Sequence, residues 1–496
     1  MTERLQHLQV AQNKIVTEDN NPIMLRGVGV GGYMNMENFI NGYPGTETKL
    51  KQEASRQMGN KKASEFFDGM ADAFFAEPDV RFIKSMGANL IRLPLNYHHF
   101  EDDDKPFQYK QKGFDRVDKV IDWAAKHDIY VALDLHAVPG GQNPDWHSDN
   151  HNESALLWQY KHFQDREVEW WKETARRYKD NPTVAIYDIH NEPSTEQPQY
   201  NPNWEIHNIH NQRVVAAIRN IDPTTIIAVE GDCFGSRYQA YDGDKNLNPN
   251  GRLNIPTSGN IILSSHNYSY EQCEPGPYPR NDKEYTPAKL DKNTTRKSFK
   301  VDQQGYEFAK EHGLPLWSGE FGALLGSNLR DVPNRLRAVD DQMDVMNQEG
   351  THWTLWTYKE KPHIGKHHSS MGLIHPRPDS IYAKAIEPIE KQKIALRTDW
   401  WMKLEENDTQ KKIVAAADAA YEATHATHDE RERNELREAF KRKAVGLTSR
   451  HLQEQWVKTF ADMSDNDRQR AVDSWKLENC EEHMAYVDIV RKNIQG

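Results

Sequence analysis

Two glutamates in short motifs could act together as a pair of catalytic carboxyl groups. Glu192 lies in Ile189-His-Asn-Glu-Pro193, and Glu320 lies in Trp317-Ser-Gly-Glu-Phe-Gly322. Each follows a short apolar run that predicts a buried strand. Taken alone, Asn-Glu-Pro could instead begin a helix, and Glu320 could simply pair with an arginine. If the two carboxyl groups face one another across one cavity, they form the pair that hydrolysis of a glycosidic bond requires.

Eight apolar runs predict the strands that would position these residues. Continuous rather than alternating hydrophobicity is typical of parallel strands buried on both faces. Segments with helical spacing separate the runs, for example 113–126, 165–178 and 204–221. Strands alternating with helices indicate a closed barrel or a doubly wound sheet. The eight runs are 24–30, 89–94, 129–135, 184–189, 225–229, 260–264, 314–317 and 353–356.

Polar residues at the ends of these runs favour a (β/α)₈ barrel over an open sheet. A barrel gathers the carboxyl ends of all its strands around one mouth, where its enzymes place their sites. Long insertions follow the first and sixth strands, at 43–58 and 270–296, and we expect them to shape specificity. The polar strand ends include Arg92, Asp134, His136, His190, Asn191, Glu192, Glu230, His266, Tyr268, Glu320 and Trp356.

From about Ala395 the sequence becomes densely charged and predicts helices without strands. We therefore predict a catalytic barrel at 1–394 and an α-helical C-terminal extension at 395–496. Trp400-Trp401 would dock the extension on the barrel. The helices could instead join a partner subunit in a homo-oligomer, or make the chain an assembly protein. The predicted helical segments are 407–423, 429–443, 447–460 and 467–494.

Composition excludes several classes of protein. The chain has 496 residues and a formal net charge of −12, which argues against binding nucleic acid or anionic membranes. No run of about 18 apolar residues predicts a membrane span, and the first twenty residues lack the apolar core of a signal peptide. We therefore expect a cytoplasmic protein. Three distant cysteines argue against a disulfide framework or a structural zinc site.

The motifs together resemble glycoside hydrolase family 5 over roughly residues 20–390. Each motif is weakly specific alone, but their combination and order are highly specific. The resemblance implies a retaining β-glycoside hydrolase with Glu192 as acid/base and Glu320 as nucleophile, about 5–5.5 Å apart. The motifs are Arg26-Gly-Val28 with Gly31-Gly32, Ile91-Arg-Leu-Pro94, Asp134-Leu-His136, His190-Asn-Glu-Pro193, His266-Asn-Tyr268, Gly319-Glu-Phe-Gly322 and Trp356.

The family's supporting roles map onto six further positions. The resemblance implies that Arg92 donates to Glu320 and that Asn191 binds the sugar 2-hydroxyl. His266 and Tyr268 would orient the carboxyl groups and adjust their pKa values. His136 would line the floor of the site, and Trp356 would stack beneath the sugar. We further expect Glu192 to be protonated at rest, ready to donate to the leaving oxygen.

The first and third strand loops resemble those of the family's exo-β-1,3-glucanases. By that analogy Glu37, Asn143, Trp146, His147 and Asp149 would close the non-reducing end of a pocket. Tyr33 stands where those enzymes carry tryptophan, and the segment 39–47 also differs. We predict an exo-acting enzyme on short β-glucosides or related β-glycosides, such as aryl and alkyl glycosides.

Several alternatives stay open. The chain could be an endo-β-glucanase, a mannanase or a glycolipid-cleaving family member, or a barrel that binds carbohydrate without cleaving it. We expect neither a metal nor a cofactor. A metal-dependent hydrolase is suggested only by the pairs His98-His99 and His367-His368. Adjacent histidines in a strand point to opposite faces, which makes chelation of one ion difficult.

Overall fold

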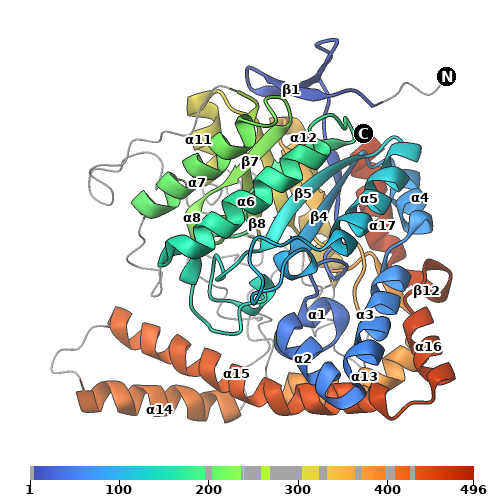
Figure 1. Ribbon diagram of the computed structural model, residues 1–496, viewed down its shortest axis with the longest axis vertical. Helices are drawn as coiled ribbons and strands as arrows, with labels where there is room; N and C mark the ends of the chain where they lie inside the picture. The colour runs from blue at the N-terminus through green and yellow to red at the C-terminus, as the bar shows by residue number, and fades with distance from the viewer. Residues whose placement is uncertain are drawn as a thin grey trace.

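Eight parallel strands close into a barrel in the computed structural model (Figure 1), with neighbours in the order β10-β3-β4-β5-β6-β7-β8-β9. All eight predicted strands and the predicted barrel are confirmed. The strands are β3 (Arg26–Gly29), β4 (Leu90–Asn96), β5 (Tyr130–Ala137), β6 (Val184–Asp188), β7 (Ile226–Glu230), β8 (Ile261–Asn267), β9 (Leu316–Phe321) and β10 (His352–Leu355). The structure describes residues 5–195, 204–235, 238, 259–268, 304–322, 332–362, 371–396, 408–424 and 430–495.

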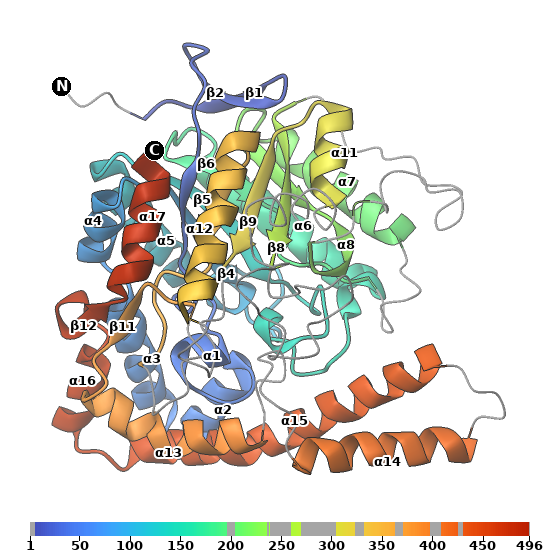
Figure 2. The same cartoon turned by 180° about the vertical axis from the view of Figure 1, so that it is seen from behind.

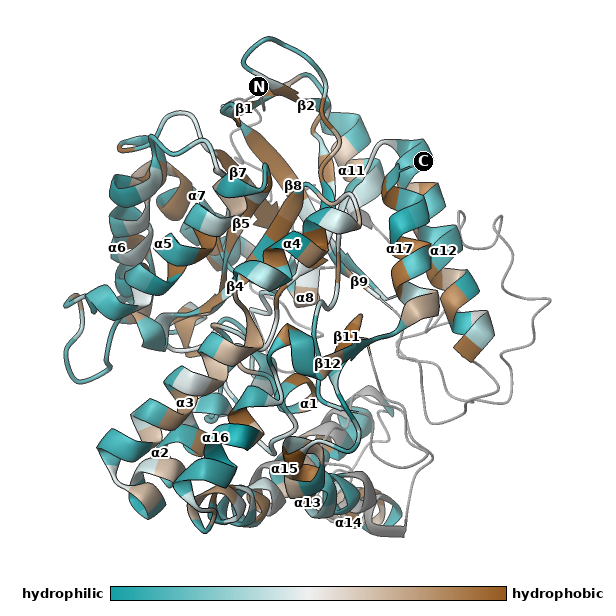
Figure 3. Cartoon of the chain, turned by 90° about the vertical axis from the view of Figure 1, so that its right-hand side faces the viewer, coloured by the Kyte–Doolittle hydropathy of each residue, from teal (hydrophilic) through white to brown (hydrophobic). Residues whose placement is uncertain are grey.

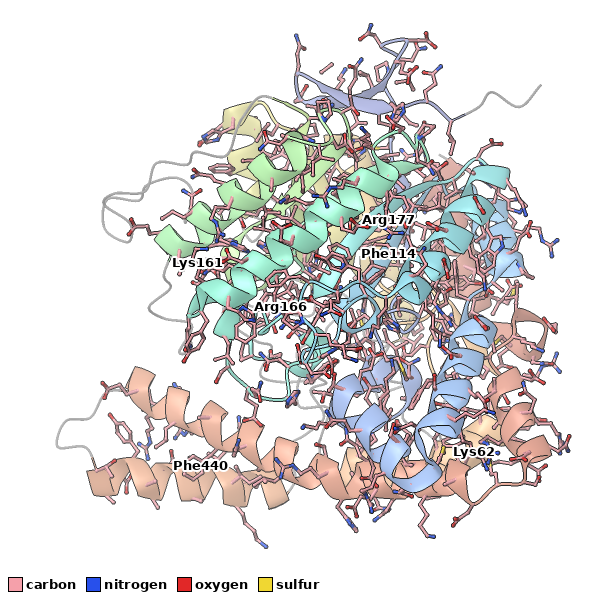
Figure 4. The ribbon with its side chains drawn as sticks, viewed as in Figure 1. Lys62, Phe114, Lys161, Arg166, Arg177 and Phe440 are labelled. Atoms are coloured by element: carbon pink, nitrogen blue, oxygen red, sulfur yellow. The ribbon has the colours of Figure 1, made fainter. Side chains whose placement is uncertain are left out.

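Helices surround the barrel, and the longer ones bury an apolar face against it. In α5 the buried Phe114, Val117, Ile121 and Ala124 recur at helical spacing. The guanidinium of Arg177 on α6 lies 3.9 Å from the ring centroid of Phe114 and joins the two helices (Figure 4). The helices between barrel strands are α1 (Asn38–Asn41), α2 (Glu47–Met58), α3 (Asn60–Phe74), α4 (Glu77–Ser85), α5 (Gln111–Lys126), α6 (Lys161–Tyr178), α7 (Trp204–Arg219), α8 (Asp232–Gly235), α11 (Gln304–His312) and α12 (Val332–Glu349).

An N-terminal hairpin of β1 (Leu8–Ala11) and β2 (Lys14–Thr17) covers the end of the barrel where the strands begin (Figure 2). Leu8 and Ile15 pack in one apolar cluster with Leu90 and Tyr130, which lie at the starts of β4 and β5. Figure 3 shows hydrophobic residues concentrated on the strands, with more hydrophilic residues on the surrounding helices. The opposite end, where the strands finish, is the mouth that carries the candidate site.

The last helix of the chain lies in the outer layer of the barrel. Helix α17 (Met484–Gln495) lies beside α12 (Figures 2 and 3). The Asn347 side chain donates to the Asn493 carbonyl at 2.8 Å, and Arg26 donates to the Ile494 carbonyl at 2.9 Å. The predicted division at residue 394 falls inside α13 (Ile381–Leu396), and a separate domain at 395–496 stays a prediction.

The remaining C-terminal helices lie at the mouth end of the barrel (Figure 1). They are α13, α14 (Asp408–Thr424), α15 (Glu430–Ala461) and α16 (Asp465–Asp473). Two predicted helical segments, 429–443 and 447–460, form the single helix α15. The intervening Gly446 does not end it, since glycine costs only about 1 kcal/mol in a helix interior. Helix α14 and the start of α15 project from the body as a hairpin (Figures 1 and 2).

One feature of the C-terminal region differs from the sequence prediction. The strand β12 (Cys480–Glu482) pairs with β11 (Ile374–Pro376) in an antiparallel two-stranded sheet, where no strand was predicted. Trp400-Trp401, His367-His368 and the insertion at 270–296 lie outside the described residues. Among the residues that the structure describes, no helix is both long and apolar enough to cross a bilayer.

Candidate active site

Glu192 and Glu320 come together at the mouth of the barrel. Glu192 follows β6 with a left-handed φ of 48°, a backbone strain that non-glycine residues adopt mainly where the surroundings impose it. Its N–H donates to Glu230 at 2.8 Å, which holds the turn in place. One oxygen of Glu192, one of Glu320 and a ring nitrogen of His266 lie within 4.8 Å of one another. This spacing fits a retaining pair at about 5–5.5 Å better than an inverting pair at about 6.5–9.5 Å.

Two histidines contact the carboxyl group of Glu192. His266 Nδ1 lies 2.6 Å from Oε1, and His147 Nε2 lies 3.0 Å from Oε2. Burial opposes ionisation, but the charge of His266 and the hydrogen bonds from both rings hold the pKa of Glu192 below its usual range. Burial likewise opposes the charge of His266, but Glu230, Glu320 and Glu192 raise its pKa well above its usual value. The lowered pKa of Glu192 runs against the expectation that this residue is protonated at rest, and the raised pKa of His266 favours a proton on that ring.

Glu320 accepts hydrogen bonds on both oxygens. Arg92 Nη1 donates to Oε1 at 2.5 Å, and the Tyr268 hydroxyl donates to Oε2 at 2.8 Å. Burial and the nearby charge of Glu320 raise the pKa of Tyr268 well above its usual value, so the hydroxyl keeps its proton. The structure thus brings together the three residues that the sequence predicted as nucleophile, arginine partner and tyrosine partner.

Arg92 lies at the centre of a buried group of four carboxyl residues. It contacts Asp188 at 3.1 Å, Asp134 at 3.1 Å and Glu230 at 3.5 Å, besides Glu320. Burial opposes its charge, but these carboxylates raise the pKa of Arg92 well above its usual value. One guanidinium cannot neutralise all four, and burial together with the charge of Glu230 raises the pKa of Asp188 well above its usual value.

Sequence reasoning did not assign a role to Asp134, Asp188 or Glu230. Glu230 was noted only as a polar strand end, and Asp134 as a polar strand end and as the first residue of the Asp134-Leu-His136 motif. Asp188 is the last residue of β6, at the end of an otherwise apolar run. A carboxylate at the carboxyl end of a predicted barrel strand was the available signal for all three residues.

Asn191, His136 and Trp356 line the same part of the site. The Asn191 Oδ1 accepts from Arg92 at 2.7 Å, and its Nδ2 lies 3.3 Å from His136 Nε2. His136 contacts Asp134 at 2.7 Å; burial opposes its charge, but the carboxylates raise the pKa of His136 to about 10. The Trp356 and His136 rings are parallel, with centroids 5.4 Å apart.

Glu37 joins this group from the segment between β3 and α1. It is buried, and its Oε1 lies 3.4 Å from His136 Nε2. Burial raises the pKa of Glu37, while His136 and His147 counteract part of that rise. The charge of Glu320 also contributes to the rise, which places the two carboxyl groups in one electrostatic environment.

Of the other residues predicted to close a pocket, two contact Glu192 and two contact other parts of the chain. His147 contacts Glu192 directly, and Asn143 donates to the Glu192 carbonyl at 2.9 Å. Trp146 packs edge-on against Phe39, with ring centroids 5.9 Å apart. Asp149 instead accepts from the Thr48 N–H at 2.8 Å, in the first turn of α2. Its side chain is therefore engaged in holding α2, and its predicted contact with a sugar stays a prediction.

A second buried group of titratable side chains includes His190, two residues before Glu192. Glu167 on α6 contacts His190 at 3.0 Å and His210 at 2.8 Å through different oxygens. Burial opposes ionisation of Glu167, but the two histidines lower its pKa to about 2. Among the described residues, this group and the Glu192, His266 and Glu320 group have ligand atoms close enough for a metal ion. The sequence expectation that no metal takes part therefore stays a prediction.

The site geometry agrees with a comparison against known families. The model of the family described as Cellulase (glycosyl hydrolase family 5) matches residues 56–362, more than half of the chain. The chain belongs to glycoside hydrolase family 5. This family 5 enzyme is 36% identical over 403 residues to a β-xylosidase of Phanerodontia chrysosporium, a match covering 80% of this chain and 78% of that protein.

Other relatives have a different named activity. Endoglucanase C of Acetivibrio thermocellus is 25% identical over 310 residues, which are 58% of this chain and 85% of that protein. A crystal structure of an endogalactoceramidase aligns with a TM-score of 0.49 and 17% identity, over 72% of this chain and 76% of that one. The family membership makes this protein an O-glycosyl hydrolase that acts on β-glycosides, as the sequence predicted.

Proposed function

We propose that this family 5 enzyme is an exo-acting retaining β-glycosidase that releases single sugars from short β-glucosides or related β-glycosides. The observation that carries the proposal is the buried Glu37 carboxyl group, 3.4 Å from His136 and beside the catalytic pair. A carboxylate there can bind hydroxyl groups of a terminal sugar and end the binding site at that sugar. The relative named β-xylosidase, which this chain matches over most of both lengths, supports action on short glycosides.

In this proposal the two glutamates act by double displacement. A Glu320 oxygen attacks the anomeric carbon and forms a glycosyl ester, while the glycosidic C–O bond breaks and its oxygen takes a proton from Glu192. Water then attacks the anomeric carbon of the glycosyl ester and gives a proton to Glu192. The bond between that carbon and the Glu320 oxygen breaks, which releases the sugar and regenerates the Glu320 carboxylate. Arg92 and Tyr268 hold Glu320 in its attacking position through the hydrogen bonds already described.

The proton reaches Glu192 through its contact with His266. The charge of Glu320 is one cause of the raised pKa of His266. That charge disappears as Glu320 bonds to the sugar, so His266 then holds its proton less tightly. The 2.6 Å contact between His266 Nδ1 and Glu192 Oε1 gives the proton a direct route to the acid/base residue. Attack by the nucleophile and supply of the proton to the leaving group are thereby coupled.

The decisive experiment compares product patterns on short and long substrates. We expect hydrolysis of nitrophenyl β-glucoside or β-xyloside, and release of monosaccharide from the non-reducing end of laminari- and cello-oligosaccharides. NMR of the first product formed should show retention of the β-configuration. An endo-glucanase is the second candidate, because the match to endoglucanase C spans 85% of that protein. Rapid loss of viscosity in a long β-glucan, with a ladder of oligosaccharides, would refute the exo proposal in favour of this candidate.

A further inference from the structure

The single-turn helix α1 (Asn38–Asn41) directly follows Glu37 and is entirely buried. The carbonyls of a helix this short mostly lack partners within the helix, and a buried carbonyl needs a hydrogen-bond donor. The position of α1 therefore depends on what donates to it. Glu37 moves with α1, because its N–H donates to the Asn41 side chain at 3.1 Å and its carbonyl accepts from the Asn41 N–H at 2.9 Å.

Three α1 carbonyls accept hydrogen bonds from the part of the chain that follows the barrel strands. Lys393 Nζ on α13 donates to the Asn38 carbonyl at 3.1 Å. The Tyr382 hydroxyl, also on α13, donates to the Asn41 carbonyl at 2.5 Å. The backbone N–H of Lys361 donates to the Ile40 carbonyl at 2.6 Å. Two of the three donors are thus side chains of one C-terminal helix.

A buried group of charges fixes Lys393 in this position. Glu390 contacts Lys393 at 2.8 Å and Lys361 at 3.1 Å, and the exposed fractions of Lys361, Glu390 and Lys393 are 5%, 2% and 0%. Glu390 therefore holds both of the lysines that donate to α1 carbonyls.

We propose that α13 is a positioning element of the sugar-binding site, in which Lys393 and Tyr382 hold α1 and so set the Glu37 carboxyl group beside His136. This proposal rests on the proposed function, in which Glu37 binds the terminal sugar. It assigns part of the C-terminal region to substrate binding, although none of its residues has to touch the sugar. A shift of α1 by part of an ångström would weaken the hydrogen bonds of Glu37 without moving Glu192 or Glu320.

The test uses Lys393→Met and Tyr382→Phe, each alone and combined with Glu37→Gln. Lys393→Met leaves Glu390 paired with Lys361. Lys391→Met is the matched control, because Lys391 lies on the same helix and contacts only solvent-exposed Glu387 among the ion pairs described. Initial rates on a nitrophenyl β-glycoside, with thermal unfolding of each variant, give KM, kcat and the folded fraction.

We expect Lys393→Met and Tyr382→Phe each to raise KM about tenfold with a smaller change in kcat, as when a charged hydrogen bond in substrate binding is lost. In the Glu37→Gln background the same changes should have no further effect on KM. Equal KM increases in both backgrounds, or unchanged KM with a lower melting temperature alone, would overturn the positioning role. An unchanged KM in Glu37→Gln itself would instead refute the proposed role of Glu37, which keeps the two failures distinguishable.

Discussion

Removing α17 should unfold the barrel rather than leave a shortened chain that still folds. Its apolar side chains Tyr486, Val487, Val490 and Ile494 are buried against the outer layer. Burial of four such side chains contributes about 6–12 kcal/mol at about 1.5–3 kcal/mol each. That amount is comparable to the whole net stability of a typical domain, about 5–15 kcal/mol. A chain that ends after residue 483 is therefore expected to be insoluble or unfolded, and inactive.

A point variant makes the same test in the full-length chain. Val490→Asp places a carboxylate without a cation at a buried position and should cost about 3–5 kcal/mol. Ala485→Asp is the matched control, since it adds the same charge to an exposed position of α17. Thermal and denaturant unfolding followed by circular dichroism measure both. Cooperative unfolding of the truncated chain at the wild-type temperature, with unchanged kcat/KM, would refute the reasoning and show that the outer layer closes without α17.

Three further outcomes test the site and its surroundings. Glu320→Gln should abolish turnover, and Glu192→Gln should lower kcat about 10²–10⁴-fold for substrates with poor leaving groups. Circular dichroism should show that both variants stay folded. Wild-type rates in either variant would contradict the assignment of the two catalytic residues. Gly31→Ala should lower kcat/KM about tenfold or more, because its Cβ would lie 2.6 Å from the Trp356 ring; an unchanged value would show that the ring's position is unimportant. Burial raises the pKa of Glu360 to about 7, above its ordinary 4.5. The folded state therefore holds this proton more tightly than the unfolded state does. The free energy of unfolding should fall by about 3 kcal/mol as the pH rises between these two pKa values. Glu360→Gln should remove that slope in melting temperature between pH 4.5 and 8, and an unaltered slope would exclude Glu360 as its source.

The barrel and its catalytic pair could be predicted because their signals are local. Each strand is a continuous apolar run, and Glu192 and Glu320 stand in short motifs at strand ends. The three-residue β12 could not be predicted, because Cys480-Glu-Glu482 has neither length nor alternating hydrophobicity. The lowered pKa of Glu192 could not be predicted either, since it depends on which histidines approach its carboxyl group. His147 lies in the loop after β5 and His266 lies on β8, far apart in the sequence, and both contact Glu192.

The location of α17 shows a different limit of sequence reasoning. Its amphipathic pattern predicts a helix, but nothing local indicates that the helix packs beside α12. That arrangement is specified by partners such as Asp340, which contacts Lys492 at 2.8 Å and Asn493 at 2.7 Å. The higher density of charged residues after residue 395 suggested a domain boundary. Charged residues indicate which face of a helix is exposed to solvent, but they do not indicate where that helix packs around the barrel.

The segments in which this chain departs from the family's exo-glucanases are also those that the C-terminal helices hold. The insertion after the first strand, 43–58, forms α2, and α1 lies just before it. Asp149 from the third strand loop accepts from the first turn of α2. Gln453 on α15 donates to the Thr46 carbonyl at 3.2 Å, just before that turn, while α13 donates to α1. The predicted contact of Asp149 with the sugar stays a prediction, and the same side chain also secures this insertion. Substrate preference in this enzyme should therefore respond to changes in α13 and α15 as well as to changes at the mouth of the barrel.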